Sequence, residues 1–567
     1  MSGPPDTTTP PSSPVPARSG WTRELVGASL LSLLLAIALA LPCLPEPHLR
    51  LLGHPEIDLS AHIWTYWWSI QADGHALVNT PFHDVQFYVL EPVNLVLFRL
   101  FQPLAGLVAA HNLVVVVGWV VAGLGGYALG RTVSRSLLAG YTGLVLLELA
   151  PATVNAVADG TGEFAWTGLL ALSLASFIRL VRRPTRGGVL LASLCFALTG
   201  TACFYYGLFV GIAALVWWIA QPQRGARARW RALAACALAA GVGALLLLPS
   251  ILAFHAAPMD LPSTRESLFA LHYTPAELSE PDLLFFLQER GVQGPFPRLG
   301  WWFLATALAV VGLRTGTELR RPAIAVGITG LVMAMGSVGP LGIPLPYHLT
   351  NRVLGVLDAG LHQPIHFLTL LILSLVILAC RLVTHRPMAS LLVLLLAVDL
   401  HPSMEWLPVP TTALPRSSAL RELRTQQGSV LDLPTILEDH QVDLDREALH
   451  QLEHHRPIPR FPVFPTSLVH SDGVRAARAS ALVRAVASGP PWGERPATGD
   501  LSAMGYRWLV LDRERSPTLS PPLQRWLGPP RWRDALVEVY DLDRQPPPDD
   551  APPALRRTEI LPAPGEP

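Results

Sequence analysis

The chain has 567 residues, of which 50% are hydrophobic and only 15% are charged, and its mean hydropathy is +0.37. These values exclude an ordinary soluble enzyme and favour a membrane protein with many helices. The 42 basic and 42 acidic residues balance, so the net charge gives no indication of a nucleic-acid partner. The five cysteines lie in or beside apolar runs and predict neither a metal centre nor a disulfide framework.

The N-terminal two thirds of the chain are dominated by apolar runs. Residues 1–20 are rich in Pro, Ser and Thr and are expected to be a disordered tail. The run at 25–44 is too long for the core of a cleaved signal peptide, so we expect it to be a signal anchor and the first span. Further spans are predicted at 111–130, 137–154, 164–181, 187–202, 204–221, 232–254, 299–314, 322–338, 364–383 and 388–400. Residues 21–400 should therefore form a domain of about eleven transmembrane helices.

The run at 93–109 differs from the others because it contains Asn94, Arg99, Gln102 and Pro103, so we expect an interfacial or re-entrant segment there. With that assignment the arginine-rich short loops all fall on one side. By the positive-inside rule this side is cytoplasmic, as is the N-terminus. The long loops at 45–110, 255–298 and 339–363 then lie outside and form the working face.

The composition changes after residue 400. Short β-like runs at 429–433, 506–511 and 536–540 are separated by helical stretches near 416–426 and 473–488. This pattern predicts a small α/β or α+β extracytoplasmic domain at 401–544. Residues 545–567 are Pro-rich and are expected to be a second disordered tail.

The first outer loop contains an acid-x-acid pair, Glu56 and Asp58. Two carboxylates at this spacing could bind a divalent cation, or one could act as a general base on a hydroxyl group. The alternative is that Asp58 only caps a helix that begins at the next residue. The residues alone do not decide between these readings.

That helix, expected at 59–72, places His62 and Tyr66 on the same face as Asp58. Trp64, Trp67 and Trp68 spread around its other faces. Since tryptophan favours the membrane–water interface, we expect these three residues to anchor the helix at the membrane surface rather than to bind a substrate.

Other acids are candidates with plainer alternatives. Asp84 and Glu91 lie further along the first loop, where isolated acids are usually solvated. Asp159 and Glu163 flank a glycine-rich turn that would let a ligand approach the backbone, although a simple helix connection would look the same. Glu148 lies inside a predicted span and should be paired or protonated, because an unpaired charge there is costly.

The loop at 339–363 and the start of the next span supply the remaining candidates. Arg352 is the best outer residue for binding a phosphate, because arginine offers a fork of donors, but it could equally contact lipid headgroups. His362 and His366 flank Pro364 and could bind phosphate or metal, although their spacing is not a recognised metal motif. Phosphate-loop and dinucleotide motifs are absent from the sequence, so no nucleotide cofactor is expected.

The order of these features resembles the GT-C superfamily of polytopic glycosyltransferases, in particular the bacterial branch akin to protein mannosyltransferases and YfhO-like proteins. The resemblance covers about 20–545, and the pieces that match are the motifs at 56–58, 110–113, 160–163, 204–207, 361–367, 430–434 and 504–511. It implies a bacterial inner-membrane enzyme that transfers a sugar from a polyprenyl-phosphate carrier at the outer face, with inversion. Asp58 first and Glu56 second take the role of catalytic base or metal partner.

One departure from the family concerns phosphate binding. Relatives often have arginines where this chain has His362 and His366, and histidine loses its charge within the physiological pH range. The leading hypothesis is a GT-C-type transferase with Asp58 as base and Arg352 on the donor phosphate, with or without a divalent cation such as Mg or Mn. The other residues expected to bind substrate are His62, Asp84, Asp159, Glu163, His362 and His366. The alternative is a non-catalytic membrane protein that binds or moves lipid-linked glycans or assembles an envelope complex.

Overall fold

The computed structural model describes residues 18–54, 59–72, 74–82, 91–158, 160–221, 230–238, 241–242, 245, 317–334, 344, 346–355, 364–385, 409–414, 416–437, 441–460 and 472–544. The two predicted tails and the loop at 255–298 therefore lie almost entirely outside the described residues. So do the predicted spans at 299–314 and 388–400.

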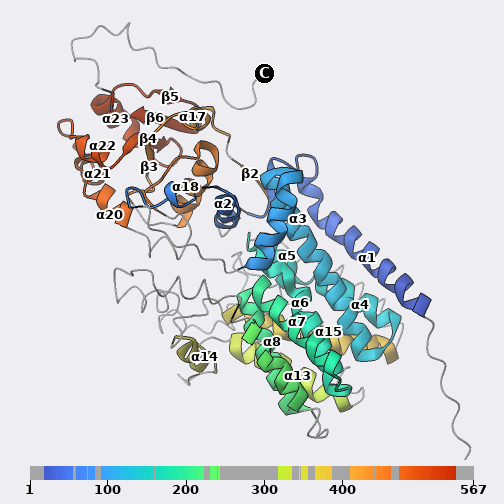
Figure 1. Ribbon diagram of the computed structural model, residues 1–567. Helices are drawn as coiled ribbons and strands as arrows, with labels where there is room; N and C mark the ends of the chain where they lie inside the picture. The colour runs from blue at the N-terminus through green and yellow to red at the C-terminus, as the bar shows by residue number, and fades with distance from the viewer. Residues whose placement is uncertain are drawn as a thin grey trace, which may run out of the picture.

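Long apolar helices form one half of the molecule (Figure 1). They are α1 (Arg18–Ala40), α3 (Pro92–Ser134), α4 (Leu137–Glu148), α5 (Pro151–Ala158), α6 (Thr167–Arg182), α7 (Arg186–Ala202), α8 (Phe204–Ala220), α13 (Thr317–Ala334), α14 (Pro346–Gly355) and α15 (Leu368–His385). Among the described residues, three stretches are long and apolar enough to cross a membrane, at Thr22–Cys43, Pro92–Ser134 and Gly162–Arg182, and four further apolar helices are shorter. These helices support an integral membrane protein, while the count of about eleven spans and the orientation stay predictions.

Helix α3 is divided by a break at Gly106, where φ is 77° and ψ is 177°, three residues after Pro103. The part before the break, 92–105, exposes Val96, Leu100 and Leu104 by 65%, 62% and 88%. Their four-residue spacing places them on one face of the helix. The break separates the segment that contains Asn94, Arg99 and Gln102 from the apolar part at 107–134. A position along the membrane surface stays a prediction.

Helices α3 and α6 touch through their backbones. A Cβ atom added to Gly125 would overlap the carbonyl oxygen of Gly168, and one added to Gly168 would overlap that of Val121. Small residues at such crossings let membrane helices approach closely. This contact fixes the start of α6 against α3.

The buried acid Glu148 is paired, as predicted. The Ser32 hydroxyl of α1 lies 2.8 Å from Glu148 Oε2 and 3.0 Å from the Val120 carbonyl oxygen of α3. A hydroxyl group has one hydrogen, so both contacts are hydrogen bonds at the same time only when Glu148 is protonated and donates to Ser32. The pairing links α1, α3 and α4.

The C-terminal residues 409–544, here called the sheet region, form a mixed sheet covered by helices. The strands are β3 (Ser429–Leu433), β4 (Tyr506–Asp512), β5 (Trp532–Arg533) and β6 (Val537–Asp541), in the order β3-β4-β6-β5, with β3 and β4 parallel and the other pairs antiparallel. The helices are α17 (Ser418–Leu423), α18 (Gln441–His454), α20 (Asp472–Arg478), α21 (Ala481–Ala487), α22 (Gly499–Ala503) and α23 (Ser520–Leu527). Three of the strands lie at the predicted positions, whereas α18 was not predicted.

A buried charge pair joins α18 to the sheet. His450 Nδ1 lies 2.7 Å from Asp432 Oδ2 of β3, and His450 Nε2 lies 4.0 Å from Asp512 Oδ2 of β4. Burial alone would lower the pKa of His450, but the charge and hydrogen bond of Asp432, helped by Asp512, outweigh burial and raise that pKa above its usual value. The pair therefore favours a charged imidazolium.

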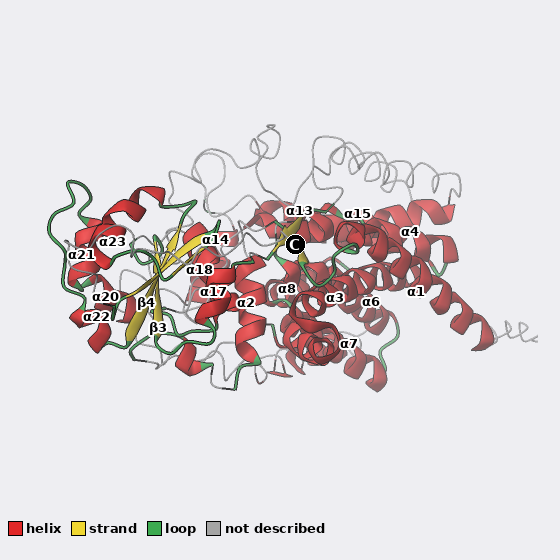
Figure 2. Cartoon of the chain, turned by 90° about the horizontal axis from the view of Figure 1, so that it is seen from above, coloured by secondary structure: helices red, strands yellow, loops and turns green. Residues whose placement is uncertain are grey.

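The segment between α1 and α3, predicted to be the first outer loop, is interleaved with the sheet region. Strand β1 (Arg50–Leu52) pairs antiparallel with β2 (Thr411–Ala413). Further along, the Ile458 N–H donates to the Leu77 carbonyl at 3.1 Å, and the Thr80 N–H donates to the Ile458 carbonyl at 3.0 Å. Helix α2 (Leu59–Ser69) lies between these two sets of contacts in the sequence, and it is beside α18 in both views (Figures 1 and 2).

The tryptophans of α2 do not anchor the chain in the membrane surface, and that prediction is wrong. Trp64, Trp67 and Trp68 are buried in a cluster shared with residues of α17, α18 and the sheet, among them Leu420 and Ala448. An aromatic ring with one polar N–H suits a buried contact between two parts of a protein as well as it suits a bilayer interface.

Candidate functional site

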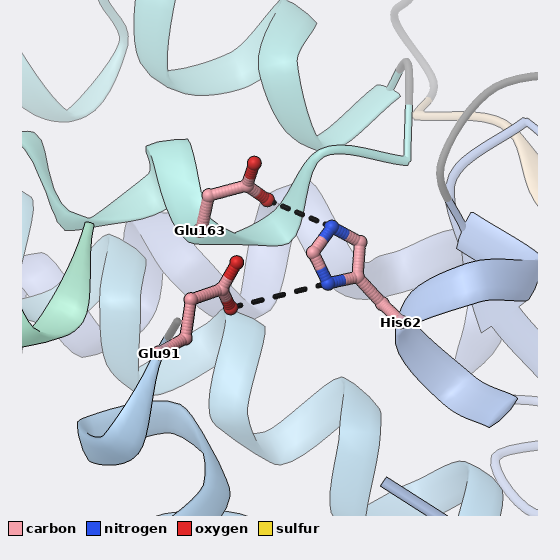
Figure 3. Close-up of side chains that lie close together, drawn as sticks. All are labelled: His62, Glu91 and Glu163. Atoms are coloured by element: carbon pink, nitrogen blue, oxygen red, sulfur yellow. Dashed lines mark ion pairs between the residues drawn. The ribbon is translucent and has the colours of Figure 1, made fainter. Parts of the chain in front are cut away.

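An imidazole and two carboxylates meet where α2 approaches the starts of α3 and η3 (Figure 3). His62 Nε2 lies 2.9 Å from Glu163 Oε2, and His62 Nδ1 lies 3.9 Å from Glu91 Oε2. All three side chains are partly buried. The imidazole thus lies between two acids that come from different parts of the chain.

Glu91 owes its position to the start of α3. It directly precedes Pro92, the first residue of that helix, where negative charge interacts favourably with the helix dipole. Asn94, one turn further on, donates from Nδ2 to Glu91 Oε2 at 2.7 Å. The carboxylate is therefore oriented by its own helix terminus.

Glu163 is brought to His62 by a tight turn. Gly160 has φ +83°, and a Cβ atom there would lie 2.7 Å from the Cβ of Leu59, the first residue of α2. The turn predicted from the glycines is confirmed, and the partner that approaches its backbone closely is the N-terminus of α2. Glu163 follows in the short helix η3 (Gly162–Trp166), which leads into α6.

Tyr66 of α2 and His111 of α3 are two further side chains of the site. The Tyr66 ring stacks on Phe98 at 4.9 Å between centroids and lies 5.9 Å from the His111 ring. Burial, followed by the charges of Glu91 and Glu163, raises the pKa of Tyr66 well above its usual value. Tyr66 is therefore a neutral phenol that can hydrogen-bond but does not supply negative charge.

His366 lies close enough to Glu163 for their charges to interact. It belongs to the short helix η5 (Pro364–Phe367), is buried, and stacks on Phe164 with centroids 4.1 Å apart and planes 16° apart. The Tyr205 ring lies 5.6 Å away. The structure thus places His366 beside the acid-imidazole cluster.

Of the predicted site residues, the structure brings together His62, Glu163 and His366. Arg352 lies in α14, and its side chain is outside the described part of the chain. The residues Glu56, Asp58, Asp84, Asp159 and His362 also lie outside the described residues.

Sequence reasoning undervalued Glu91 and did not assign His111 to the site. The signal for Glu91 was its place directly before a proline that opens a helix. The sequence signal for His111 was its place in the motif at 110–113, which resembles the GT-C family.

The cluster has the chemistry of a divalent-cation site. His62, Glu91 and Glu163 each offer one ligand atom, and these atoms lie within 4.8 Å of one another. The Oε2 atom of Glu163 is buried and lies 2.9 Å from His62 Nε2, so a bound cation would take the place of that contact. One nitrogen and two oxygen ligands suit a cation such as Mn²⁺ or Zn²⁺ better than Mg²⁺, which prefers oxygen throughout. These ligands differ from the acid pair at 56 and 58 that the sequence suggested.

No protein-family model and no curated protein matches the chain. Among solved structures, the mycobacterial arabinofuranosyltransferase AftD matches with a TM-score of 0.56 and 16% identity, over 92% of this chain and 40% of that one. A mutant form of AftD matches with a TM-score of 0.57 and 16% identity, over 92% and 42%. ArnT from Cupriavidus metallidurans, with undecaprenyl phosphate bound, gives a TM-score of 0.43 and 15% identity, over 92% and 98%.

These comparisons establish the fold. The chain has the fold of the GT-C glycosyltransferases, as its sequence indicated, and it spans 40% of the length of AftD. The narrower branch of protein-mannosyltransferase and YfhO-like members stays a prediction.

Proposed function

We propose that this protein is a membrane-embedded glycosyltransferase that moves a sugar from a polyprenyl-phosphate donor to an acceptor hydroxyl at the outer face of the membrane. The observation that carries the proposal is the convergence of His62, Glu91 and Glu163 at one end of the apolar helices. A lipid-anchored donor has its reacting bond at headgroup depth, so the chemistry has to lie at such a boundary. The fold shared with AftD supports the same class of reaction.

The transfer breaks the bond between the sugar and the phosphate and forms a bond to the acceptor oxygen. The acceptor loses its proton to a general base, and the leaving phosphate takes the electron pair of the broken bond. We assign the base to Asp58, which directly precedes α2, with Glu56 as second choice. The reacting groups would lie against the paired side chains of His62 and Glu163, whose Nε2 and Oε2 atoms are 2.9 Å apart.

The charge on the leaving phosphate also needs compensation. Arg352 is our candidate for this role, because its guanidinium could bind two phosphate oxygens. A divalent cation held by His62, Glu91 and Glu163 would supply positive charge to the same group when bound. His366, next to Glu163, is the candidate for a neutral hydrogen-bond partner of the donor.

A non-catalytic role in binding lipid-linked glycans would also need converging polar groups, but it would not need an imidazole paired with two carboxylates. The structure brings residues from α2, α3, η3 and η5 to one place. Catalysis can use this pairing, which is why we favour the enzyme.

The test uses the purified full chain in lipid nanodiscs with a panel of polyprenyl-phosphate pentoses and hexoses, with Mn²⁺ or with a chelator. We expect Asp58→Asn to lower transfer by about a hundredfold or more, the usual range for a general acid or base. Glu163→Gln should also lower transfer, because it removes the charged partner of His62. Glu422→Gln, on the exposed side of α17, is the matched control and should transfer like the wild type. Undiminished transfer by Asp58→Asn would refute the assignment of the base. Consumption of none of the donors would refute the proposed class of reaction.

A further inference from the structure

Helix α2 packs against two parts of the molecule, the apolar helices and the sheet region. One face carries His62 and Tyr66 toward the candidate site. The other face buries Trp64 and Trp67 in the cluster shared with the sheet region. Figure 2 shows α2 between the membrane helices and the sheet region.

The helix is too short to hold its own position. It has 11 residues, and isolated helices shorter than about 12–15 residues are marginal in water. Its stability and orientation therefore come from the surfaces on which it packs. The position of the His62 ring depends on those surfaces as well.

Gln451 of α18 is the polar centre of this packing. It is 0% exposed, and its Oε1 atom accepts a hydrogen bond of 2.7 Å from the Trp64 indole N–H. Its Nε2 atom donates to the Leu77 carbonyl at 2.7 Å and to the Arg456 carbonyl at 2.9 Å. One side chain thus binds α2, the segment that follows α2, and the loop that follows α18.

Aromatic contacts around this hydrogen bond restrict rotation of the helix. Trp64 stacks on Trp68 with centroids 5.9 Å apart and planes 17° apart. The Trp67 ring meets the His455 ring edge-on at 5.0 Å. A turn of α2 about its axis would move His62 away from Glu163 and would break these contacts together.

We propose that Gln451 is a positioning residue for the candidate site: through the Trp64 indole it fixes α2 and so holds His62 between Glu91 and Glu163. The catalytic consequence of this inference rests on the proposed function, but the mechanical part does not. The sheet region then acts as part of the site rather than as a separate module. Gln451 touches none of the reacting groups and works only through α2.

The test compares Gln451→Leu and Trp64→Phe with a control, Trp526→Phe. Trp526 is also buried and also donates its indole N–H, to the Gly493 carbonyl at 3.2 Å, but it packs in a separate cluster of the sheet region. Hydrogen exchange of the full chain in nanodiscs reports on α2 at residues 59–69. Both test variants lose the hydrogen bond between Trp64 and Gln451, and this loss should speed exchange of α2 about tenfold while exchange of β4 and β6 stays unchanged. Gln451→Leu also loses the bonds to the Leu77 and Arg456 carbonyls, so Trp64→Phe isolates the bond to α2.

Two further readouts separate positioning from general damage. The kcat for donor transfer should fall about tenfold with KM unchanged, because groups that are bound but misaligned react more slowly. The double variant Trp64→Phe, Gln451→Leu should lose no more than Gln451→Leu alone, since both changes remove the same bond.

Unchanged exchange of α2 in Gln451→Leu would overturn the inference, as would a fall in kcat no larger than that of Trp526→Phe. If α2 loosens only in the test variants while the wild type transfers no sugar, the positioning role stands and the proposed function fails. Trp64→Phe keeps an aromatic ring at this position, and Trp526→Phe controls for the smaller ring, so this pair gives a result even if Gln451→Leu does not fold.

Discussion

The close contact of α3 and α6 at Gly125 and Gly168 can be tested by adding one methyl group to the contact. Replacing Gly168 by Ala adds one methyl group where the Val121 carbonyl of α3 already lies. The obstacle is backbone, so no side-chain rotation relieves it. Helix α6 has to move away from α3, and Glu163, which lies in η3 five residues before Gly168, has to move with it.

The expected cost follows from what surrounds each position. Overpacking a close contact typically costs about 1–3 kcal/mol, and more where backbone blocks the added atom. Gly211 in α8 is the matched control, because a Cβ atom there meets nothing within 4 Å. Gly211→Ala should be neutral or stabilise by about 0.5–1 kcal/mol, since alanine is the better helix former.

Thermal unfolding in nanodiscs, followed by tryptophan fluorescence, measures both variants. We expect Gly168→Ala to unfold about 1–3 °C below the wild type, and Gly211→Ala at or above it. Sugar transfer should fall in Gly168→Ala only, because Glu163 is displaced from His62. Equal unfolding midpoints for the two variants would refute the backbone contact.

Three further outcomes test the site, the sheet region and the membrane helices. Glu91→Gln should weaken Mn²⁺ binding at least about tenfold, measured by electron paramagnetic resonance of free Mn²⁺, and unchanged affinity would remove Glu91 from the ligand set. Because the pKa of His450 is raised in the fold, its pairing with Asp432 stabilises fully below about pH 6.5 and fades as the pH rises through the raised value. The loss of thermal stability in His450→Gln should therefore be larger at about pH 6 than at about pH 8.5, and a pH-independent loss would contradict the charged pair. Glu148→Gln keeps a donor to Ser32 and should unfold within about 1 kcal/mol of the wild type, whereas Ser32→Ala should cost about 1–3 kcal/mol, and the reverse order would contradict a protonated acid.

Local patterns in the sequence predicted local structure well. Strands β3, β4 and β6 appeared as short runs of β-branched and apolar residues, and α2 (Leu59–Ser69) covers most of the helix expected at 59–72. Helix α18 was missed because its inward positions include Glu447, His450 and Gln451, polar residues that the fold buries. An apolar stripe interrupted in this way does not show the usual helical period.

The candidate site could be predicted only in part, for a different reason. His62, Glu163 and His366 were recognisable as polar residues beside spans, but their meeting point depends on tertiary contacts between segments far apart in sequence. The tryptophans of α2 were placed wrongly because their preference for interfaces does not distinguish a bilayer from a neighbouring domain. Only the position of α18 makes that distinction.

The interleaving of the first outer loop with the sheet region also sets an order of events during synthesis. Trp64 and Gln451 are 387 residues apart, which takes about 20–80 seconds to translate at roughly 5–20 residues per second. During that interval α2 has its tryptophans uncovered and its packing partner does not yet exist. Contacts of such long sequence separation form late in folding. The apolar face of α2 must therefore be shielded until the last fifth of the chain has been made. A chain interrupted before α18 should retain its apolar helices without an assembled site.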